Sequence, residues 1–435
     1  MQSPIWSLSF PYRVYLCLTL AITKQRKKLY IKVWHDRQMI IGIVGKANVG
    51  KSTFFKALTM ADILIANYPF ATIEPNKGCG YVRVPCACKD LGVQCTPRFG
   101  YCEKGTRFVA VEILDVAGLV PGAHEGKGMG NQFLDDLRQA DALVHVVDIA
   151  GSTNEKGEPV EAGSYDPLQD IRWLEIELDM WFYGILKKGW EKFARAVQQE
   201  KKKISTQLAT QLSGLNVKEK TVEEAMKHTQ VDTAKPTEWT EEQMKKLARE
   251  IRKATKPMVI AANKADMPTA DQNIQRAREE FKELEIVPTS AESELALKEA
   301  AKKEIIDYVP GDNEFTITGQ PDERQQKALE FIREKVLKKL GSTGVQQTLE
   351  TAVFDLLNYI AVFPGGVNNL KDSQGRVLPD CFLLAPGSTA YNFAEKLHTD
   401  IAKGFIGAID VRTKRRIGKD QQLKHRDVIE ILTRS

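Results

Sequence analysis

The chain has 435 residues, of which 43% are hydrophobic and 27% are charged, so we expect a globular protein of about two to four domains. Neither an internal repeat nor a low-complexity tract interrupts it. The formal net charge is +5, but residues 1–38 hold seven Lys/Arg and one acid, so the rest carries a net charge of −1. The basic balance therefore does not by itself indicate a body that binds nucleic acid.

Residues 1–38 differ in composition from the rest of the chain. Their uninterrupted apolar run, Val14–Thr23, is too short to span a bilayer. The positive cluster Lys24–Lys28 comes after this run, whereas a secretory signal carries its positive charge before the apolar region. We expect Met39 to be the true start, no role for residues 1–38 in the fold, and a cytoplasmic protein without a membrane contact. A tail that touches a membrane is the alternative.

Apolar, β-branched runs alternate with helical patterns from residue 39 to about residue 150 and resume near residue 257. This alternation predicts an α/β fold with a doubly wound, mostly parallel sheet. The expected strands are Ile40–Val44, Phe108–Leu114, Ala142–Val147, Pro257–Ala262 and Ile286–Pro288.

The octet GKANVGKS, Gly45–Ser52, matches the phosphate-loop pattern G-x-x-x-x-G-K-[ST] between an expected strand and an expected helix. Its glycines let backbone N–H groups turn inward on phosphates, with a helix N-terminus behind them. Lys51 would reach the β- and γ-phosphates, and Ser52 would bind Mg²⁺. The candidate nucleotide-binding residues here are Gly45, Asn48, Val49, Gly50, Lys51, Ser52 and Thr53.

The stretch NYPFATIEPN, Asn67–Asn76, lies where the first switch of a GTPase belongs. We expect Thr72 to be the second protein ligand of Mg²⁺. Thr53 and Thr59 are weaker candidates for this ligand because both fall on the helix after the phosphate loop.

Five of the seven cysteines fall between residues 79 and 102, and the odd total without a secretory signal indicates a reducing compartment. Cys86, Cys88, Cys95 and Cys102 have the pattern C-x-C-x₆-C-x₆-C, which could form a tetrahedral Zn²⁺ site, with Cys79 as a spare ligand. The spacing departs from paired C-x₂-C knuckles, so a loop of reduced, partly buried cysteines is the alternative.

The tetrapeptide DVAG, Asp115–Gly118, ends the next β-rich run. Asp115 would hold the Mg²⁺ shell, and the backbone N–H of Gly118 would sense the γ-phosphate. Ras-like GTPases then place a glutamine that orients the attacking water. Leu119 occupies that position here, and its side chain can neither accept a proton nor orient water.

Residues 166–255 are rich in Lys, Glu, Gln and Ala and have apolar residues at helical spacing, which predicts an all-helical insertion, either a hairpin or a coiled coil. Its section Lys187–Lys203 carries seven basic residues and two acids. This basic arm is either a solvated helix face or a surface that faces RNA.

The tetrapeptide NKAD, Asn263–Asp266, comes directly after the apolar run PMVIAA. The Asp266 carboxylate can accept two hydrogen bonds from guanine, from N1–H and the 2-amino group, and adenine offers no such pair. Asn263 would tie the loop and contact the base, and the stem of Lys264 can lie on the base. In the stretch TSA, Ser290 and Ala291 complete the nucleotide-binding candidates, with the Ala291 N–H directed to guanine O6.

Residues 295–345 have a helical pattern, and short strands with turns begin at about residue 352. The segment Val411–Lys419 is the densest basic patch of this last region. The expected divisions are an N-terminal extension, 1–38; a nucleotide-binding domain in two parts, 39–165 and 256–350, the second with a helical connection; a helical insertion, 166–255; and a β-rich C-terminal domain, 351–435.

These motifs together resemble a GTPase of the Obg family, YchF subfamily, of an archaeal type. The resemblance rests on GKANVGKS, NYPFATIEPN, DVAGLVPGAHEGKGMGNQFL and NKAD, and it covers about residues 39–435. The stretch from PGSTAYNFAEKL to VIEI resembles the TGS domain, which is named for threonyl-tRNA synthetase, GTPase and SpoT. The resemblance implies a GTPase domain with a helical insertion and a small β-grasp domain. Many YchF proteins have NxxE in place of NKAD and accept ATP, so Asp266 favours GTP here.

The resemblance also implies that an apolar residue replaces the catalytic glutamine, as Leu119 does here. The catalytic candidates are then Lys51, Thr72 and Gly118. Related GTPases with an asparagine at the place of Asn48 hold K⁺ between that side chain and the phosphates, where it could act as an arginine finger does. His124 and Lys127 are further candidates, and an exposed switch residue without a catalytic part is the alternative for both.

Two functions fit the motifs. The first is a monomeric GTPase that hydrolyses GTP slowly to GDP and uses its nucleotide state to control docking to ribosomes or RNA through the TGS-like domain and the basic arm. The second is a nucleotide-gated signalling or stress adaptor with little hydrolysis. A metabolic kinase is excluded by NKAD and by the lack of an acceptor site.

Overall fold

The computed structural model describes residues 39–59, 76–116 and 136–434. Its main sheet has seven strands, in the order β2-β4-β1-β5-β6-β7, with β3 paired to β4. The strands from β4 to β7 along this order are parallel, whereas β2 and β3 run antiparallel to β4. The bounds are β1 Ile40–Val44, β2 Lys77–Pro85, β3 Tyr101–Glu103, β4 Thr106–Asp115, β5 Ala142–Asp148, β6 Met258–Asn263 and β7 Glu285–Pro288.

The doubly wound sheet expected from the sequence is confirmed, and each of the expected strands is present. The sequence did not predict β2 or β3. In β2 two glycines and a proline dilute the apolar signal, and β3 has only three residues. The chain winds from β1 to β4 on one side and to β5 on the other, so β1 lies where the winding reverses. Open α/β sheets bind ligands at the carboxyl ends of the strands at such a point.

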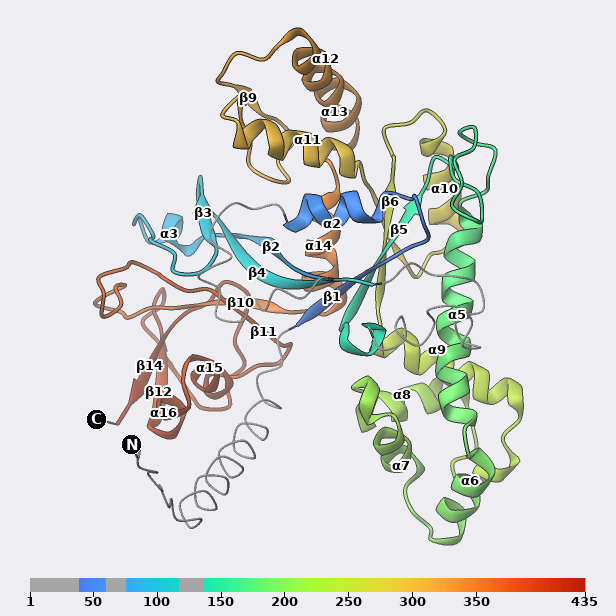
Figure 1. The fold of residues 1–435 in the computed structure, drawn as a ribbon. Helices are drawn as coiled ribbons and strands as arrows, with labels where there is room; N and C mark the ends of the chain where they lie inside the picture. The colour runs from blue at the N-terminus through green and yellow to red at the C-terminus, as the bar shows by residue number, and fades with distance from the viewer. Residues whose placement is uncertain (1–38, 60–75, 117–135, 435) are drawn as a thin grey trace, which may run out of the picture. The chain divides into compact units, whose positions relative to one another are not determined.

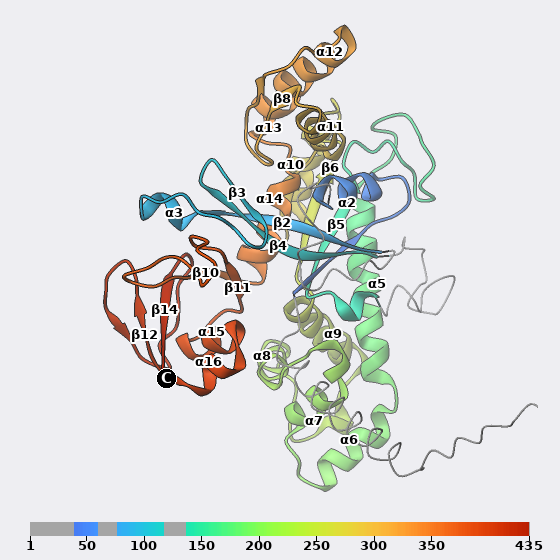
Figure 2. The same ribbon diagram turned by 60° about the vertical axis from the view of Figure 1, so that its left-hand side comes forward.

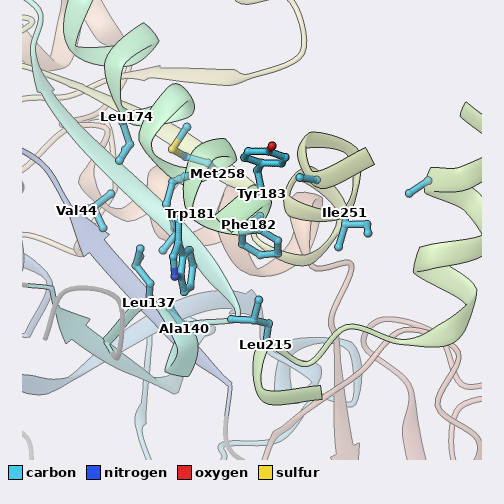
Figure 3. Packing of buried hydrophobic residues seen from close by; sticks show 14 of the residues in the cluster. Val44, Leu137, Ala140, Leu174, Trp181, Phe182, Tyr183, Leu215, Ile251 and Met258 are labelled. Atoms are coloured by element: carbon cyan, nitrogen blue, oxygen red, sulfur yellow. The ribbon is translucent and has the colours of Figure 1, made fainter. Parts of the chain in front are cut away.

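Residues 166–255 form several α-helices rather than the hairpin or coiled coil that periodicity suggested. They are α5 Leu168–Lys187, α6 Trp190–Gln199, α7 Ile204–Gln211, α8 Glu219–Thr229 and α9 Glu241–Thr255. Their apolar faces share one buried cluster with the sheet, in which Trp181, Phe182 and Ile251 of the helices lie with Val44 and Met258 of the strands (Figure 3). The helices therefore belong to the same core as the main sheet.

The region 291–356 is mostly helical and contains one short hairpin within an irregular stretch. The helices are α11 Ala291–Lys302, α12 Glu323–Phe331, α13 Lys338–Leu340 and α14 Val345–Glu350, with π-helical turns at Ile332–Leu337 and Thr351–Leu356. The helical pattern expected over 295–345 is interrupted at β8 Ile306–Asp307 and β9 Thr316–Ile317, which pair antiparallel. Buried Ile306 and Phe315 of this hairpin region pack in one cluster with Leu329 and Val336, so packing overrides the local helical pattern. Figure 1 shows this region, with α11, α12 and β9 labelled.

The C-terminal region forms a second sheet of five strands in the order β11-β10-β14-β12-β13. The strands are β10 Ile360–Pro364, β11 Phe382–Leu384, β12 Phe405–Asp410, β13 Arg416–Ile417 and β14 Val428–Thr433. The helices α15 Ala390–Leu397 and α16 Thr399–Lys403 belong to the same region (Figure 2). β10 and β14 are parallel, and the other pairs are antiparallel. Phe393 of α15 is fully buried with Val362 and Ile429 of the strands, so this domain has a core of its own.

No helix in the described ranges is long and apolar enough to cross a membrane. Several sites named from the sequence lie outside these ranges: Thr72, Gly118, Leu119, His124, Lys127 and residues 1–38.

Candidate functional site

The phosphate loop joins β1 to α2, Lys51–Thr59, at the carboxyl edge of the sheet. Two of its glycines are required by their surroundings. A Cβ on Gly45 would lie 2.6 Å from the carbonyl oxygen of Val146, and Gly50 has a φ of +91°. A Cβ on Gly50 would lie 2.3 Å from the side-chain nitrogen of Asn263. The loop therefore takes its shape only because these two residues lack side chains.

The start of α2 supplies free N–H groups to this loop. The first helical hydrogen bond runs from the N–H of Phe54 to the carbonyl of Gly50, 2.8 Å away. The N–H groups before Phe54 have no partner four residues back, and the helix dipole adds positive potential at this end. Ser52 is exposed and Thr53 is half-buried, so both hydroxyls are available at the helix start. This arrangement suits an anion such as a phosphate.

Lys51 forms an ion pair with Asp115. Asp115 ends β4 and lies beside Ile43 of β1 in the parallel register, which brings its carboxylate to the phosphate loop. The two side chains are 13% and 25% exposed, so neither is sealed from an incoming ligand. The sequence assigned Lys51 to phosphates and Asp115 to the Mg²⁺ shell, and the structure places these two groups in contact.

Asn263 connects three loops. Its side-chain N–H donates to the carbonyl of Val49 at 2.9 Å, and its Oδ1 accepts from the N–H of Ala291 at 3.0 Å. The residue is 4% exposed, so these bonds lie in a protected environment, where losing one leaves a costly unpaired group. The phosphate loop, the NKAD loop and the TSA loop are thus tied into one unit.

The other residues of the NKAD loop are placed differently from one another. Lys264 has a φ of +62°, and its ammonium donates to Asp148 Oδ2 at 2.8 Å and to Ser152 Oγ at 2.9 Å. Asp266 is half-buried, and no described residue donates a hydrogen bond to its carboxylate. Lys264 is therefore anchored, whereas the Asp266 carboxylate is available to a ligand.

The TSA loop is more internally bonded than the sequence pattern suggested. Ser290 is 2% exposed, its hydroxyl bonds Ser293, and its N–H donates to the carbonyl of Thr343 at 2.9 Å. The N–H of Ala291 is engaged by Asn263, so a bond to guanine O6 requires that contact to be exchanged. Ser290 and Ala291 belong to the group of loops that Asn263 ties together. Their contact with a base stays a prediction.

The segment 148–170, between β5 and α5, packs on the phosphate loop, and the sequence patterns did not reveal its part in the site. Asp148 is adjacent to Asn263 in the β5–β6 register and is 1% exposed. Its Oδ2 accepts from Ser152 at 2.7 Å and Thr153 at 3.0 Å as well as from Lys264. One feature of the sequence could have revealed this role. Asp148 is an aspartate at the end of a buried strand, and β5 ends at the same edge of the sheet as the strand that leads into NKAD.

Lys46, the second residue of the phosphate loop, is fixed by this segment. Its ammonium lies 2.7 Å from Asp170 Oδ2, 3.1 Å from the carbonyl of Thr153 and 4.0 Å from the centre of the Tyr165 ring. Burial raises the pKa of Asp170 above its ordinary value, and Lys46 opposes this effect. Burial, followed by the hydrogen bond to Asp170, raises the pKa of the Tyr165 hydroxyl. The side chains of Lys46 and Asp170 are 7% and 8% exposed, so this is a buried ion pair behind the phosphate loop.

Asn48 also contacts the segment. It has a φ of +61°, and its side-chain N–H donates to the carbonyl of Gly157 at 2.8 Å. A Cβ on Gly157 would come within 2.8 Å of the Ala47 carbonyl oxygen, so the two backbones approach closely. The Oδ1 atom of Asn48 accepts no hydrogen bond from a described residue, and the side chain is exposed.

Three family models match separate parts of the chain. A model described as 50S ribosome-binding GTPase matches residues 40–174. The model of the Obg-like GTPase YGR210-like, G4 motif-containing domain matches residues 261–367, and the TGS domain model matches residues 370–433.

Curated relatives match nearly the whole chain. An uncharacterized GTP-binding protein of Methanocaldococcus jannaschii is 51% identical, with 91% of this chain and 99% of the relative covered. An uncharacterized GTP-binding protein of Schizosaccharomyces pombe is 38% identical, with 85% and 93% covered. The ribosome-binding ATPase YchF of Escherichia coli O157:H7 is 30% identical, with 90% and 98% covered.

Two solved structures share the fold. A GTP-binding protein of Pyrococcus horikoshii OT3 has a TM-score of 0.71 at 42% identity and covers 91% of this chain and 100% of its own. The YchF GTPase of Schizosaccharomyces pombe has a TM-score of 0.56 at 20% identity, covering 91% and 98%, and is similar in fold.

Proposed function

The chain belongs to the YchF/Obg-like family of GTP-binding proteins, and we propose that it binds GTP in preference to ATP and hydrolyses it to GDP and phosphate. We further propose that it acts in the cytoplasm as a monomeric, nucleotide-dependent switch that docks on ribosomes or RNA. The bridge made by Asn263 carries the proposal, because it holds the NKAD loop and the phosphate loop at one pocket. A nucleotide with its phosphates at α2 would then have its base at Asp266.

The relatives differ in the nucleotide that they are named for: those near 30% identity are named ATPases, and those at 38% and 51% are named GTP-binding proteins. The available carboxylate of Asp266 supports guanine, because it can accept both N1–H and the 2-amino group. A hydrogen bond to a charged group contributes about 1.5–3 kcal/mol, or roughly 10- to 100-fold in affinity. Lys264 would form the floor for the base, with its amine held by Asp148 and Ser152.

Titration with fluorescent GTP and ATP analogues tests this choice. The parent should bind GTP at least about 10-fold more tightly than ATP, and Asp266→Ala should lose that preference. Asp271→Ala is a matched control, because this nearby carboxylate is 61% exposed and pairs with Lys339 at 2.7 Å. Equal affinity of the parent for the two nucleotides would contradict the proposal.

Hydrolysis would rest on Lys51 and the groups around it. Ser52 and Asp115 offer the oxygen ligands that suit Mg²⁺, together with Thr72, which lies outside the described residues. Mg²⁺ bound there would neutralise charge that develops on the phosphate oxygens. Lys51, now paired with Asp115, would turn to the β- and γ-phosphates, and the N–H of Gly118, also outside the described residues, would meet the γ-phosphate. The Oδ1 of Asn48 is an available ligand for K⁺.

Multiple-turnover phosphate release distinguishes a hydrolysing switch from a silent adaptor. We expect slow release of phosphate from GTP, faster release in K⁺ than in Na⁺, and acceleration by ribosomes. Lys51→Ala should abolish turnover or nucleotide binding without unfolding the chain, because it removes an ion pair with Asp115 and leaves the hydrophobic core intact. Tight GTP binding with no turnover under any of these conditions would favour the adaptor.

Partner binding is proposed for the C-terminal domain. The patch Lys414–Arg416 with Lys419 is exposed, and none of its side chains pairs with a carboxylate of a described residue. In the basic arm four of the seven cations, Lys187, Arg195, Lys202 and Lys203, pair with nearby glutamates, whereas among the described residues of Val411–Lys419 only Arg412 pairs with a carboxylate, that of Asp90. Unpaired cations release more counterions on binding phosphates, so the C-terminal patch is the stronger candidate and the arm a secondary contact. Bacterial relatives are named ribosome-binding ATPases, which supports a partner of this kind.

A further inference from the structure

Four cysteine sulfurs converge in the connection that leads along the chain from β2 to β4, outside the nucleotide site. Cys86 and Cys88 lie at the start and within α3, Ala87–Asp90, Cys95 lies in the extended stretch after this helix, and Cys102 is on β3. All four sulfurs lie within 4.8 Å of one another. Cys79, the spare ligand considered from the sequence, is not in the group; its sulfur contacts the carbonyl of Gly80 at 3.6 Å.

The sulfur spacing suits a tetrahedral metal. With Zn–S bonds of about 2.3 Å, two sulfurs of a tetrahedral site lie about 3.8 Å apart. The distance from Cys86 to Cys95 is 3.8 Å, and that from Cys88 to Cys102 is 4.0 Å. A disulfide needs about 2.05 Å, so neither pair is at bonding distance. Three of the four residues are buried and Cys102 is half-buried, so the ligands enclose a small, closed centre.

We propose that Cys86, Cys88, Cys95 and Cys102 bind one structural Zn²⁺, and that this metal holds the segment 86–105 in the shape that docks the C-terminal domain. On binding, the four thiols lose their protons to solvent and four Zn–S bonds form, with no change of oxidation state. A site with four protein ligands keeps no open position, which is the pattern of structural rather than catalytic zinc.

A counter-charge is already in place. A Zn²⁺ ion with four thiolates carries a net charge of −2, which is costly to bury alone. Arg107 on β4 is fully buried, lies opposite Cys102 in the β3–β4 register, and interacts electrostatically with Cys86 and Cys95. Its Nε is buried without a hydrogen-bond partner in the described part of the chain. Zinc-bound thiolates would place negative charge beside this buried guanidinium.

The same segment forms the contact with the C-terminal domain. The backbone of 96–98 pairs with 377–379 through Thr96 N–H to Val377 O at 2.9 Å and Arg98 N–H to Pro379 O at 2.8 Å. Arg98 also makes two bonds to Asp380, at 3.1 and 2.7 Å, as expected for a strong planar pair.

Two further contacts bracket the cluster. Arg107 donates to the carbonyl of Leu378 at 2.6 Å, and Asp90 of α3 accepts from Arg412 at 2.8 Å and Arg426 at 2.7 Å. Figures 1 and 2 both show α3 beside the C-terminal domain. The docking groups therefore alternate with the cysteines along the chain: Asp90, Thr96, Arg98 and Arg107.

The segment has little regular structure of its own. α3 has four residues, β3 has three, and the stretch from Leu91 to Gly100 has no regular structure. Short elements of this kind cannot bury enough apolar surface to fix their own conformation, and metals commonly substitute for the missing core. Loss of the ion should therefore loosen the docking contacts first and leave the nucleotide-binding sheet folded.

Metal analysis of the full chain, purified without chelator and under reducing conditions, tests the site. We expect a zinc content near one per chain, release of that zinc when a mercurial titrates the thiols, and the visible spectrum of a tetrahedral thiolate site after exchange with Co²⁺. The double variant Cys88→Ser/Cys102→Ser should lose the metal. Cys79→Ser is the matched control and should keep it. A metal-free parent with four titratable thiols, two disulfides in the cluster, or iron in place of zinc would each overturn the proposal.

Hydrogen exchange tests the docking role without requiring any activity. Removal of zinc from the parent should speed exchange at Thr96, Arg98 and Val377 by at least about tenfold, while the amides of β1 and β5 keep their protection. Arg98→Gln should speed exchange at the same amides yet retain the zinc, since it breaks the contact with Asp380 and spares the cysteines. Unchanged exchange in the zinc-free protein would show that the ion does not hold the interface.

Discussion

Gly50 shows how a single residue sets the geometry of the nucleotide loop. Its φ of +91° is a conformation that side chains disfavour, and the side-chain nitrogen of Asn263 occupies the space where a Cβ would go. This contact belongs to the bridge that joins the phosphate loop to NKAD. The glycine is thus needed for the approach of a second loop as well as for the turn itself.

Gly50→Ala should therefore abolish tight nucleotide binding, because the new methyl group displaces Asn263 and strains the loop. Titration with a fluorescent GTP analogue measures the loss, and circular dichroism checks that the chain folds. Gly184→Ala is the control: Gly184 lies in α5 with no atom within 4 Å of its Cβ position, so it should keep binding and gain about 0.5–1 kcal/mol. Parental affinity in Gly50→Ala would contradict this role.

His145 gives the fold a pH dependence. It lies on β5 at 1% exposure, and burial, with a smaller effect from Lys46, lowers its pKa from 6.5 to about 3. Between these values the unfolded chain binds a proton that the folded chain does not. Stability is therefore complete above pH 6.5 and falls as the pH drops towards 3, by up to about 1.4 kcal/mol per pH unit.

Urea unfolding at pH 7.5 and pH 5.5 measures this dependence. His145→Leu, which keeps a side chain of similar volume without a titrating group, should lose less stability between the two pH values than the parent does. His228 is 71% exposed, so His228→Gln should behave as the parent. If the parent and His145→Leu lose the same amount of unfolding free energy between the two pH values, His145 is not held neutral in the folded chain.

At the scale of elements, the segment 148–170 acts as a brace behind the phosphate loop. It supplies Asp170 to Lys46, a carbonyl to Asn48, and Asp148 to Lys264. The phosphate loop and the NKAD loop are therefore both held by contacts with the segment that connects β5 to α5. Any change in this brace should reach the phosphate and base contacts together.

Asp170→Asn should test the brace, because it leaves the Lys46 ammonium buried without its counter-ion. Breaking a buried pair from one side costs about 3–5 kcal/mol. Lys46→Met/Asp170→Asn removes both charges and should be less destabilised than Asp170→Asn alone. Urea unfolding measures the stability, and GTP titration should show weaker binding in the single variant. A loss below about 1 kcal/mol, the range of exposed pairs, would show that the pair is solvated.

At the scale of the whole molecule, the nucleotide site and the proposed partner surface lie in different domains. The first is formed by Gly45–Ser52 and Asn263–Asp266, and the second lies at Lys414–Lys419 in the C-terminal domain. The C-terminal domain has its own core around Phe393, and the cysteine segment and the neighbouring Arg107 supply several of its contacts with the rest of the chain. The proposed zinc would therefore sit at the junction through which a nucleotide-dependent change could reach the partner surface.

Charge reversal at Arg415 and Arg416 should weaken co-sedimentation with ribosomes, and the difference from the parent should shrink at high salt, because the contact with phosphates is electrostatic. GTP affinity should be unchanged. Reversal of Lys282 and Lys303, exposed residues of the sheet domain, is the control and should leave co-sedimentation intact. A smaller loss is expected from reversal of Lys201 and Lys202 in the basic arm. Parental sedimentation after reversal at 415 and 416 would exclude this patch as the docking surface.

The sequence by itself determined the parallel strands of the sheet, their order along the chain and the positions of GKANVGKS and NKAD at strand ends. Such features are local: GKANVGKS needs only a strand before it and a helix after it, and NKAD needs only the end of a buried run. The helical nature of 166–255 was likewise readable from periodicity. Its arrangement was not, because α5 to α9 pack against one another and the sheet through residues far apart in sequence.

Tertiary structure alone decided which side chains meet. Lys46 pairs with Asp170, and Asn263 donates a hydrogen bond to Val49. The two residues of each pair are more than 100 positions apart in the sequence, and no local pattern encodes these contacts. The cysteine spacing left two interpretations open, and only the convergence of four sulfurs within 4.8 Å favours a metal. Periodicity reports the environment of one element at a time, whereas ion pairs, bridges and metal ligands depend on how elements pack. The sequence thus predicts the elements and the motifs, and the packing supplies the contacts that make a site of them.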